Sequence, residues 1–161
     1  MPNAIRYVVG DATRPEGPGP KIIAHVCNDA GRWGAGFSGA VTRRFGRAPC
    51  EQYRDWFWTG STFALGEVQL VEVRPALWVA NMIGQHGVGR GGPDGPPVRY
   101  EAIGQALSKV AGHAQRLEAS VHMPRIGAGL AGGRWEQIEP LILHALVERG
   151  VEVTVYDLGD P

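Results

Sequence analysis

The chain has 161 residues, which is the length of one domain, and we expect a single domain over residues 1–161. Lysine and arginine together number 16, as do aspartate and glutamate, so the formal net charge is zero. This balance argues against a protein that coats nucleic acid through a large overall positive charge. An enzyme that recognises one modified nucleotide remains compatible with it. Cys27 and Cys50 have neither the spacing of a metal site nor that of a redox pair.

The sequence shows no features of export or membrane insertion. No charged-then-apolar leader opens it, and no apolar stretch approaches the ~18 residues of a spanning helix. We therefore expect a reduced, cytoplasmic protein that is a monomer and has no membrane partner, no cofactor and no obligate metal.

Hydrophobic periodicity predicts strands that alternate with helices. In chain order we expect strands over 4–9 and 21–27, helices over 36–45 and 49–58, strands over 66–73 and 77–83, a helix over 99–117, a strand over 120–123, a helix over 135–149 and a strand over 151–156. The run 21–27 is nearly all apolar, as in a strand buried on both faces, whereas 66–73 alternates apolar and polar residues. This order of elements predicts an α/β fold with a mostly parallel sheet.

Two glycine-rich segments, 22–37 and 121–135, each begin in an apolar strand and lead into a predicted helix. Glycine lets backbone N–H groups come close to a ligand, and the N-terminus of the following helix is positive. Each segment therefore suits a phosphate, and the pair could hold a diphosphate from two sides. A third segment, 84–97, is rich in glycine and proline, and we expect a mobile loop that could close over substrate.

These motifs resemble those of the macrodomain family. The resemblance rests on residues 10–12 (GDA), 28–36 (NDAGRWGAG) and 123–130 (MPRIGAGL), and it extends from residue 5 to residue 158. The branch it is most similar to contains terminal ADP-ribose protein glycohydrolase, the remodeller-associated macrodomains and the DNA ADP-ribosyl antitoxin macrodomains. The resemblance implies a three-layer α/β/α sandwich with a mixed, mostly parallel sheet, which binds ADP-ribose at the carboxyl ends of its strands.

Carried over position by position, the resemblance assigns roles to residues of this chain. Asp11 matches the acid that accepts a hydrogen bond from the adenine amino group, and Asn28 matches a polar residue near the distal ribose. Residues 34–37 match the first phosphate loop, residues 127–130 match the second, and Tyr156 lies where the family flanks the adenine. The residues expected to contact ADP-ribose are Asp11, Ala12, Asn28, Trp33, Gly34, Ala35, Gly36, Phe37, Asn81, Gly84, Gly127, Ala128, Gly129, Leu130, Ala131 and Tyr156.

The sequence departs from the family pattern at two positions. Glycohydrolases of this branch use a lysine after the middle strand and an aspartate in the second loop, where this chain has Gln85 and Ala131. Glutamine cannot form a covalent adduct at the anomeric carbon, and alanine cannot act as a base. The chain either binds ADP-ribose without cleaving it or hydrolyses by another arrangement, such as a water held by the diphosphate of the substrate.

We expect the protein to remove mono-ADP-ribose from a macromolecule by hydrolysis. Its partner is then ADP-ribose or a mono-ADP-ribosylated protein or DNA. The ADP-ribose is attached to an acidic side chain of the protein or to a base of the DNA. Gln85 and Asn28 are expected to position the scissile end of the distal ribose, and Asp29 or His86 to transfer protons. The alternatives are a non-catalytic ADP-ribose reader, a phosphatase acting on ADP-ribose 1″-phosphate, and a nucleotide-binding scaffold with no preference for ADP-ribose.

Other residues have structural interpretations. His25 and His122 lie inside apolar strands, where packing and hydrogen bonding are expected. Trp58 is expected in the core. Arg125 is expected to support carbonyls of the second loop, with direct contact to a phosphate as the alternative. Trp33 is interpreted either as packing or as an aromatic wall of the site.

A short basic run, Arg43, Arg44 and Arg47, lies at the end of a predicted helix. Such a run is usually solvated and complements the negative end of the helix dipole. Contact with a nucleic-acid phosphate is the alternative interpretation.

Overall fold

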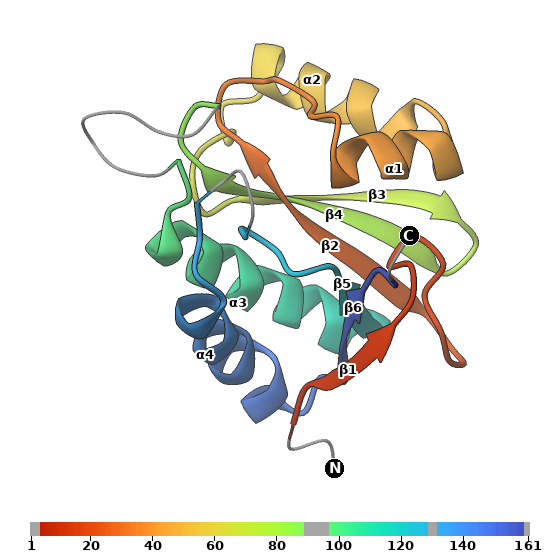
Figure 1. Ribbon diagram of the computed structural model, residues 1–161. Helices are drawn as coiled ribbons and strands as arrows, with labels where there is room; N and C mark the ends of the chain where they lie inside the picture. Colours follow the sequence, from red (N-terminus) through yellow and green to blue (C-terminus); the bar gives the residue numbers. More distant parts are fainter. Residues whose placement is uncertain (1–3, 89–96, 129–131, 160–161) are drawn as a thin grey trace.

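The computed structural model describes residues 4–88, 97–128 and 132–159, and Figure 1 shows a sheet with helices on both faces. The strands are β1 Arg6–Val9, β2 Lys21–Asn28, β3 Val68–Arg74, β4 Leu77–Gln85, β5 Ser120–Met123 and β6 Val153–Asp157. The helices are α1 Phe37–Phe45, α2 Ala48–Thr59, α3 Tyr100–Leu117 and α4 Trp135–Ala145. Because α1 and α2 cover one face and α3 and α4 cover the other, the α/β/α sandwich is confirmed. No helix within the described ranges is long and apolar enough to cross a membrane.

The strands follow the order β1-β6-β5-β2-β4-β3. Neighbouring strands pair in parallel except β3 and β4, which are antiparallel. The mixed, mostly parallel sheet expected from the sequence is therefore confirmed. Strand β3 can reverse direction because antiparallel neighbours need only a tight turn, and Ala76 supplies it with a positive φ of 60°.

Strand β2 brings the two glycine-rich segments together. It pairs with β4 on one side and with β5 on the other, where Ile22 lies opposite Val121. Parallel strands present their carboxyl ends at one edge of the sheet, so the loops after β2 and β5 emerge side by side. The first leads to α1 on one face and the second to α4 on the other face (Figure 1). Divergence of this kind opens a crevice at the strand ends.

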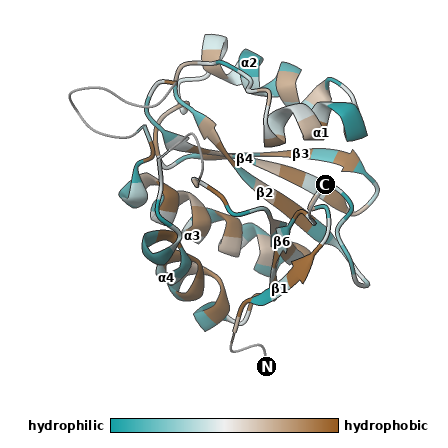
Figure 2. Ribbon diagram, viewed as in Figure 1, coloured by the Kyte–Doolittle hydropathy of each residue, from teal (hydrophilic) through white to brown (hydrophobic). Residues whose placement is uncertain are grey.

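An apolar core on each face of the sheet holds the layers together. Successive strand residues point to opposite faces, so Ile22 packs in the core with α3 and Ile23 packs with α1. Both are fully buried, which explains why residues 21–27 are apolar almost throughout. Figure 2 shows hydrophobic residues along the strands and on part of each helix surface. On α3 the buried residues recur at helical spacing and include Ile103, Leu107, Val110 and Ala114.

Two sequence-based expectations are wrong. The helix expected over 135–149 ends at Ala145, and the chain tightens into a 3₁₀ helix, Val147–Arg149, before Gly150 turns it with a φ of 80°. Trp58, expected in the core, is 79% exposed. It follows buried Tyr53 by five residues, which places it roughly 140° around α2 from the buried side.

Candidate ligand-binding site

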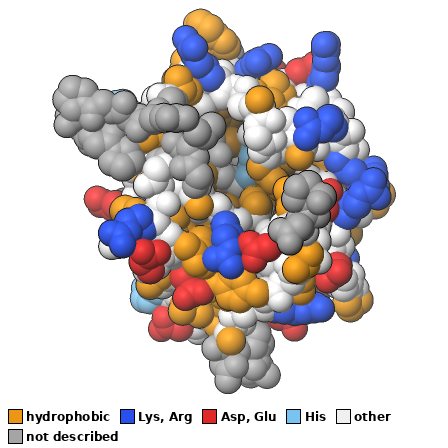
Figure 3. Space-filling view, in the orientation of Figure 1, with side chains coloured by type: hydrophobic (Ala, Val, Ile, Leu, Met, Phe, Trp, Pro, Cys, Tyr) orange, Lys and Arg blue, Asp and Glu red, His pale blue; other side chains and the backbone are white. Residues whose placement is uncertain are grey.

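A cavity of about 700 Å³ lies at the carboxyl ends of β2, β4 and β5. Residues 32–38 and 124–128 form two of its walls, and Asn28, Gln85 and Val88 also line it. The hollow is visible near the centre of the face drawn in Figure 3. Its volume is within the range of small-molecule pockets and suits a nucleotide-sized ligand.

Asn28, the last residue of β2, folds the first glycine loop. Its Oδ1 accepts hydrogen bonds from the N–H groups of Ala30 at 3.0 Å and Arg32 at 3.1 Å, and from the Tyr53 hydroxyl at 2.9 Å. Its Nδ2 donates to the Arg32 carbonyl at 2.6 Å. The side-chain amide of Asn28, which is expected near the distal ribose, is therefore used largely to hold residues 29–32. Its main structural role is to fix the shape of the cavity wall.

The N-terminus of α1 lies at the cavity with open backbone. A Cβ placed on Gly34 or Gly36 would meet no heavy atom within 4 Å. Within the described residues, no side chain caps α1 at Gly36. The first N–H groups of the helix therefore keep hydrogen-bonding capacity, and the positive end of the helix dipole adds to it. This combination favours an anion.

Trp33 lines the cavity and packs at the same time, so its two interpretations apply together. The indole Nε1 donates to the Ser38 carbonyl at 3.0 Å and to Thr42 Oγ1 at 2.8 Å. The ring lies edge-on to His25, with centroids 5.4 Å apart, and 5.5 Å from the Tyr53 ring. These contacts fix the first loop against α1 while one part of the ring stays at the cavity.

The second loop closes on itself through glycines. Gly127 has a φ of +72° and accepts a hydrogen bond from Gly133 N–H at 2.8 Å. A Cβ on Gly133 would lie 2.2 Å from the Gly127 oxygen, which is too close for any side chain. Ala128 follows at the cavity wall. The expected contacts that lie outside the described residues are Gly129, Leu130 and Ala131.

The four residues with expected catalytic roles gather at the ends of β2 and β4. Gln85 lines the cavity, and its Nε2 donates to the Gly87 carbonyl at 2.9 Å. Asp29 Oδ2 lies 2.7 Å from His86 Nδ1, and Asp29 Oδ1 accepts from Gly87 N–H at 2.8 Å. Asn28 completes the group on the β2 side. In the described parts of the chain, no group of three or more His, Cys, Asp or Glu side chains is placed to hold a metal ion.

The segment 84–97 is held at both ends. His86 N–H donates to the Pro97 carbonyl at 2.7 Å, and Arg99 N–H donates to the Gly84 carbonyl at 2.8 Å. Residues 89–96, which carry most of the expected mobile loop, lie outside the described residues.

Asn81 and Gly84 are not among the residues that line the cavity. Asn81 is fully buried; its Oδ1 lies 2.7 Å from His25 Nε2, and its Nδ2 donates to Gln69 Oε1 at 3.0 Å. At Gly84 a Cβ would lie 2.8 Å from the Ile103 side chain, so glycine is needed there for packing. Both residues therefore support β4 from within the core.

The expected adenine residues lie at the ends of β1 and β6, outside the lining of the cavity. Asp11 Oδ1 accepts from Thr13 N–H at 2.9 Å and Thr13 Oγ1 at 2.7 Å. Asp11 Oδ2 has no hydrogen-bond partner within the described residues, so it is free to accept from a ligand. Ala12 is buried beside it, and the Tyr156 ring packs against Gly10, 3.4 Å from a Cβ at that glycine.

Sequence reasoning missed nine residues of the cavity wall, which are His25, Val26, Cys27, Arg32, Ser38, Val88, Pro124, Arg125 and Ile126. Six of them belong to β2 or to the segment directly after β5, and the other three lie in or beside glycine-rich loops. Arg32 stands inside the first loop motif, so its position was visible, but a side chain before glycines carries no sign of its direction. Val88 could not be assigned because it lies in the glycine-rich segment after β4.

His25 and His122 are buried and hydrogen-bonded, which confirms their structural interpretation. His122 Nδ1 lies 2.7 Å from the Tyr156 hydroxyl, and its Nε2 lies 2.7 Å from Ser120 Oγ. Burial lowers the pKa of each histidine to about 4, because the charged form loses its water.

We expect acid to destabilise the protein through these two histidines. Their folded pKa of about 4 lies below the unfolded value, so the unfolded chain binds more protons between pH 6.5 and 4. The stabilisation from the two neutral histidines should be fully present above pH 6.5. The free energy of unfolding should then fall as the pH approaches 4, by about 3 kcal/mol for His25 alone. Urea unfolding at pH 7, 5.5 and 4.5 measures this. The exposed-site variant His144→Gln should keep the same profile, and a flat profile for the unaltered protein would contradict the prediction.

Arg125 has a structural role, but its partner is not the one expected. Its Nε donates to Asp157 Oδ1 at 2.6 Å and its Nη2 donates to Oδ2 at 3.0 Å. The guanidinium also lies 5.2 Å from the Tyr7 ring centroid and 5.1 Å from that of Trp135. A carboxylate forms a stronger bond with this fork than loop carbonyls do. Trp135 packs the start of α4 against β1 through this cluster, with Nε1 3.0 Å from the Tyr7 hydroxyl.

Comparison with known proteins identifies the family. No family model matches the chain. A macrodomain protein from Streptomyces coelicolor is 57% identical, with 96% of this chain and 99% of that chain covered and a TM-score of 0.84. This chain therefore belongs to the macrodomain family.

Two further similarities extend the comparison. Chromodomain-helicase-DNA-binding protein 1-like from Danio rerio is 31% identical over 95% of this chain, and the chain spans only 15% of that protein. The share is 18% for the Mus musculus protein of the same name. A structure of Thermosipho africanus DarTG in complex with ADP-ribose has a TM-score of 0.67 and 17% identity, with 84% of this chain and 37% of that chain covered. That last likeness is one of fold.

Proposed function

We propose that this macrodomain binds ADP-ribose in the 700 Å³ cavity and removes mono-ADP-ribose hydrolytically from a modified macromolecule. One observation carries the proposal: the uncapped N-terminus of α1 and the glycine turn at Gly127 line the same cavity. Both supply backbone N–H groups, which can stabilise a diphosphate even though the chain has no net positive charge. The ADP-ribose complex of the similarly folded DarTG protein supports the choice of ligand.

The ends of the ligand have chemically suitable neighbours. Asp11, with one free carboxylate oxygen, suits the exocyclic amine of adenine. The scissile end would meet Gln85, which lines the cavity. Asp29 and His86, the residues directly after β2 and β4, lie at the same strand ends but outside the cavity lining. The 2.7 Å contact between Asp29 and His86 orients the imidazole, so this pair is suited to transfer a proton during attack by water. The diphosphate of the substrate would hold that water.

Two measurements test the proposal. Calorimetry should show that ADP-ribose binds more tightly than ADP or AMP, because only ADP-ribose carries the distal ribose. Defined substrates with glutamate-linked and thymidine-linked ADP-ribose should release free ADP-ribose in at least one case. Equal affinity for ADP would contradict the distal-ribose half of the proposal, and failure on both substrates would contradict the hydrolase half.

The second candidate function is a non-catalytic ADP-ribose reader. The observation that favours it is Gln85, which stands where related glycohydrolases have lysine and whose amide bonds to the chain itself at Gly87. Tight binding of ADP-ribose together with no turnover of either substrate would select this function. Phosphate release from ADP-ribose 1″-phosphate alone would instead select a phosphatase.

Replacement of Gln85 separates binding from turnover. We expect Gln85→Ala to lower turnover on the order of 100-fold, because the reacting end loses a positioning group, while ADP-ribose affinity changes little. Single-turnover kinetics and calorimetry measure the two effects. The matched control is Gln52→Ala, at an exposed position of α2 that does not line the cavity. Unchanged turnover in Gln85→Ala would remove this residue from the mechanism.

A further inference from the structure

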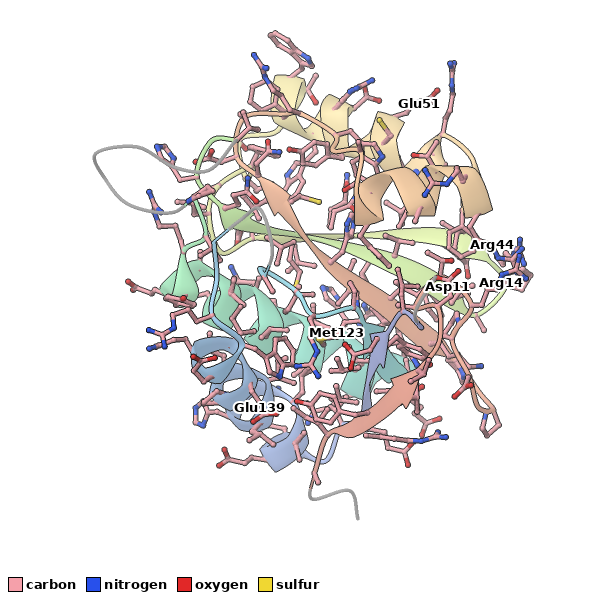
Figure 4. All side chains as sticks on the ribbon, in the orientation of Figure 1. Asp11, Arg14, Arg44, Glu51, Met123 and Glu139 are labelled. Carbon is pink, nitrogen blue, oxygen red and sulfur yellow. The ribbon has the colours of Figure 1, made fainter. Side chains whose placement is uncertain are left out.

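A second cavity, of about 380 Å³, lies apart from the proposed ADP-ribose cavity and shares none of its lining residues. It is formed by the loop between β1 and β2, the end of α1 and the turn between β3 and β4. Its charged lining residues are Arg14, Lys21, Arg44 and Arg74, and we call it the basic pocket. Figure 4 shows Arg14 and Arg44 close together at the edge of the molecule, with Asp11 nearby.

The positive charge of the basic pocket is not neutralised by carboxylates. Within the described residues, none of its four cations forms an ion pair. Lys21 Nζ donates to the Gly19 carbonyl, at 2.9 Å. Asp11 is close enough to favour the charge of Arg44, but within the described residues it forms no ion pair with Arg44 or with the other three cations. In a chain of zero net charge, these four cations form a local excess of positive charge, whereas Arg125 is paired with Asp157.

Two of these guanidinium groups lie against the same aromatic ring. Arg44 lies 5.8 Å and Arg74 lies 5.3 Å from the centroid of the Phe45 ring. A shared aromatic surface attracts both cations and fixes their direction. Arg44 Nε is buried and has no hydrogen-bond acceptor among the described residues. Burial, followed by Arg74 and Arg14, lowers the pKa of Arg44, as expected for cations that repel one another. An anion between them would relieve this repulsion.

We infer that the basic pocket binds a phosphate group of a nucleic-acid strand. The planar fork of arginine matches phosphate oxygens, and two such forks can share one phosphate. The strand, as opposed to a single free phosphate, is favoured because two more exposed cations lie near Arg44 in the sequence. Arg43 and Arg47 flank Arg44 in the sequence, are exposed, and have no ion pair within the described residues. A strand carries successive phosphates that can meet them.

The test is a salt titration with a fluorescently labelled single-stranded oligonucleotide, followed by anisotropy. The double variant Arg44→Gln, Arg74→Gln should bind at least ~10-fold more weakly and should show a smaller salt slope, by about 0.7 for each phosphate that the variant no longer neutralises. The control, Arg116→Gln with Arg149→Gln, removes the same charge from exposed positions of the α3–α4 layer. It should bind like the unaltered protein.

Three outcomes would overturn the inference: no salt-dependent binding by the unaltered protein, equal weakening in the control, or binding of pyrophosphate, measured by calorimetry, without any binding of the oligonucleotide. The last would assign the pocket to a free anion. Thermal unfolding verifies that the double variant folds, and Lys21→Gln provides a second variant at the rim that should also weaken binding. Calorimetry should show that all of them still bind ADP-ribose, because the cavity proposed for its diphosphate shares no lining residue with the basic pocket.

Discussion

Gly133→Ala is expected to weaken ADP-ribose binding about 100-fold, which corresponds to ~2.7 kcal/mol. The added Cβ would lie 2.2 Å from the Gly127 oxygen and 2.9 Å from its carbonyl carbon, and backbone atoms cannot move aside as a flexible side chain can. The hydrogen bond from Gly133 N–H to Gly127 must therefore break, and the loop N–H groups lose their direction. The loss of one or two charge-assisted hydrogen bonds to the diphosphate accounts for the magnitude. Calorimetry measures it.

Gly112→Ala is the matched control for this change. Gly112 lies in the interior of α3, where a Cβ would meet nothing within 4 Å. Alanine there should leave ADP-ribose affinity unchanged and should stabilise the protein by about 0.5–1 kcal/mol, because glycine loses more chain entropy in a helix. Normal ADP-ribose affinity in Gly133→Ala would show that the second loop does not hold the diphosphate.

Asn28→Ala is expected to have the largest effect on stability among changes at the cavity wall. It removes three bonds accepted by Oδ1 and one donated by Nδ2, and it leaves the N–H groups of Ala30 and Arg32 without this partner. At about 1 kcal/mol for each bond, the free energy of unfolding should fall by roughly 4 kcal/mol. The melting temperature should fall by about 8–16 °C. ADP-ribose affinity should fall as well, because residues 29–36 lose their anchor.

A double-mutant cycle with Tyr53→Phe separates this network from general damage. Tyr53 donates to the Asn28 carbonyl at 2.6 Å and to Oδ1 at 2.9 Å, and its side chain is fully buried. Tyr53→Phe alone should cost about 1–2 kcal/mol. The double variant should lose less than the sum, because the two residues share one network. Fully additive losses would show that Asn28 does not stabilise the loop through Tyr53.

A buried polar chain beneath the first loop links the cavity wall to the sheet. Ser38, in the first turn of α1, lies 3.4 Å from His25 Nδ1, and His25 Nε2 lies 2.7 Å from Asn81 Oδ1. Asn81 in turn donates to Gln69 on β3 at 3.0 Å. Polar groups inside a protein are costly unless each has a partner, so a fully paired chain favours one arrangement of α1 over the sheet. The N-terminal end of α1, which lines the cavity, is therefore held in place by hydrogen bonds that reach the sheet.

The sequence determined the alternation of strands and helices and the two glycine turns, since both follow from local patterns of apolar residues and glycine. The end of α4 and the exposure of Trp58 were harder to predict from the sequence. Which residues of a helix are exposed depends on which side of the helix packs against the sheet. Resemblance to a family, beyond periodicity alone, was needed to predict the sandwich and the ligand.

Only the tertiary structure decided which distant residues meet. Pairing of β2 with β5 placed the two loops at one cavity, and pairing of β5 with β6 gave Arg125 its partner Asp157. The same folding set Arg14, Arg44 and Arg74 around one pocket although they come from three separate segments. Such contacts depend on strand order and register, which long-range packing selects, and no local stretch of sequence encodes them.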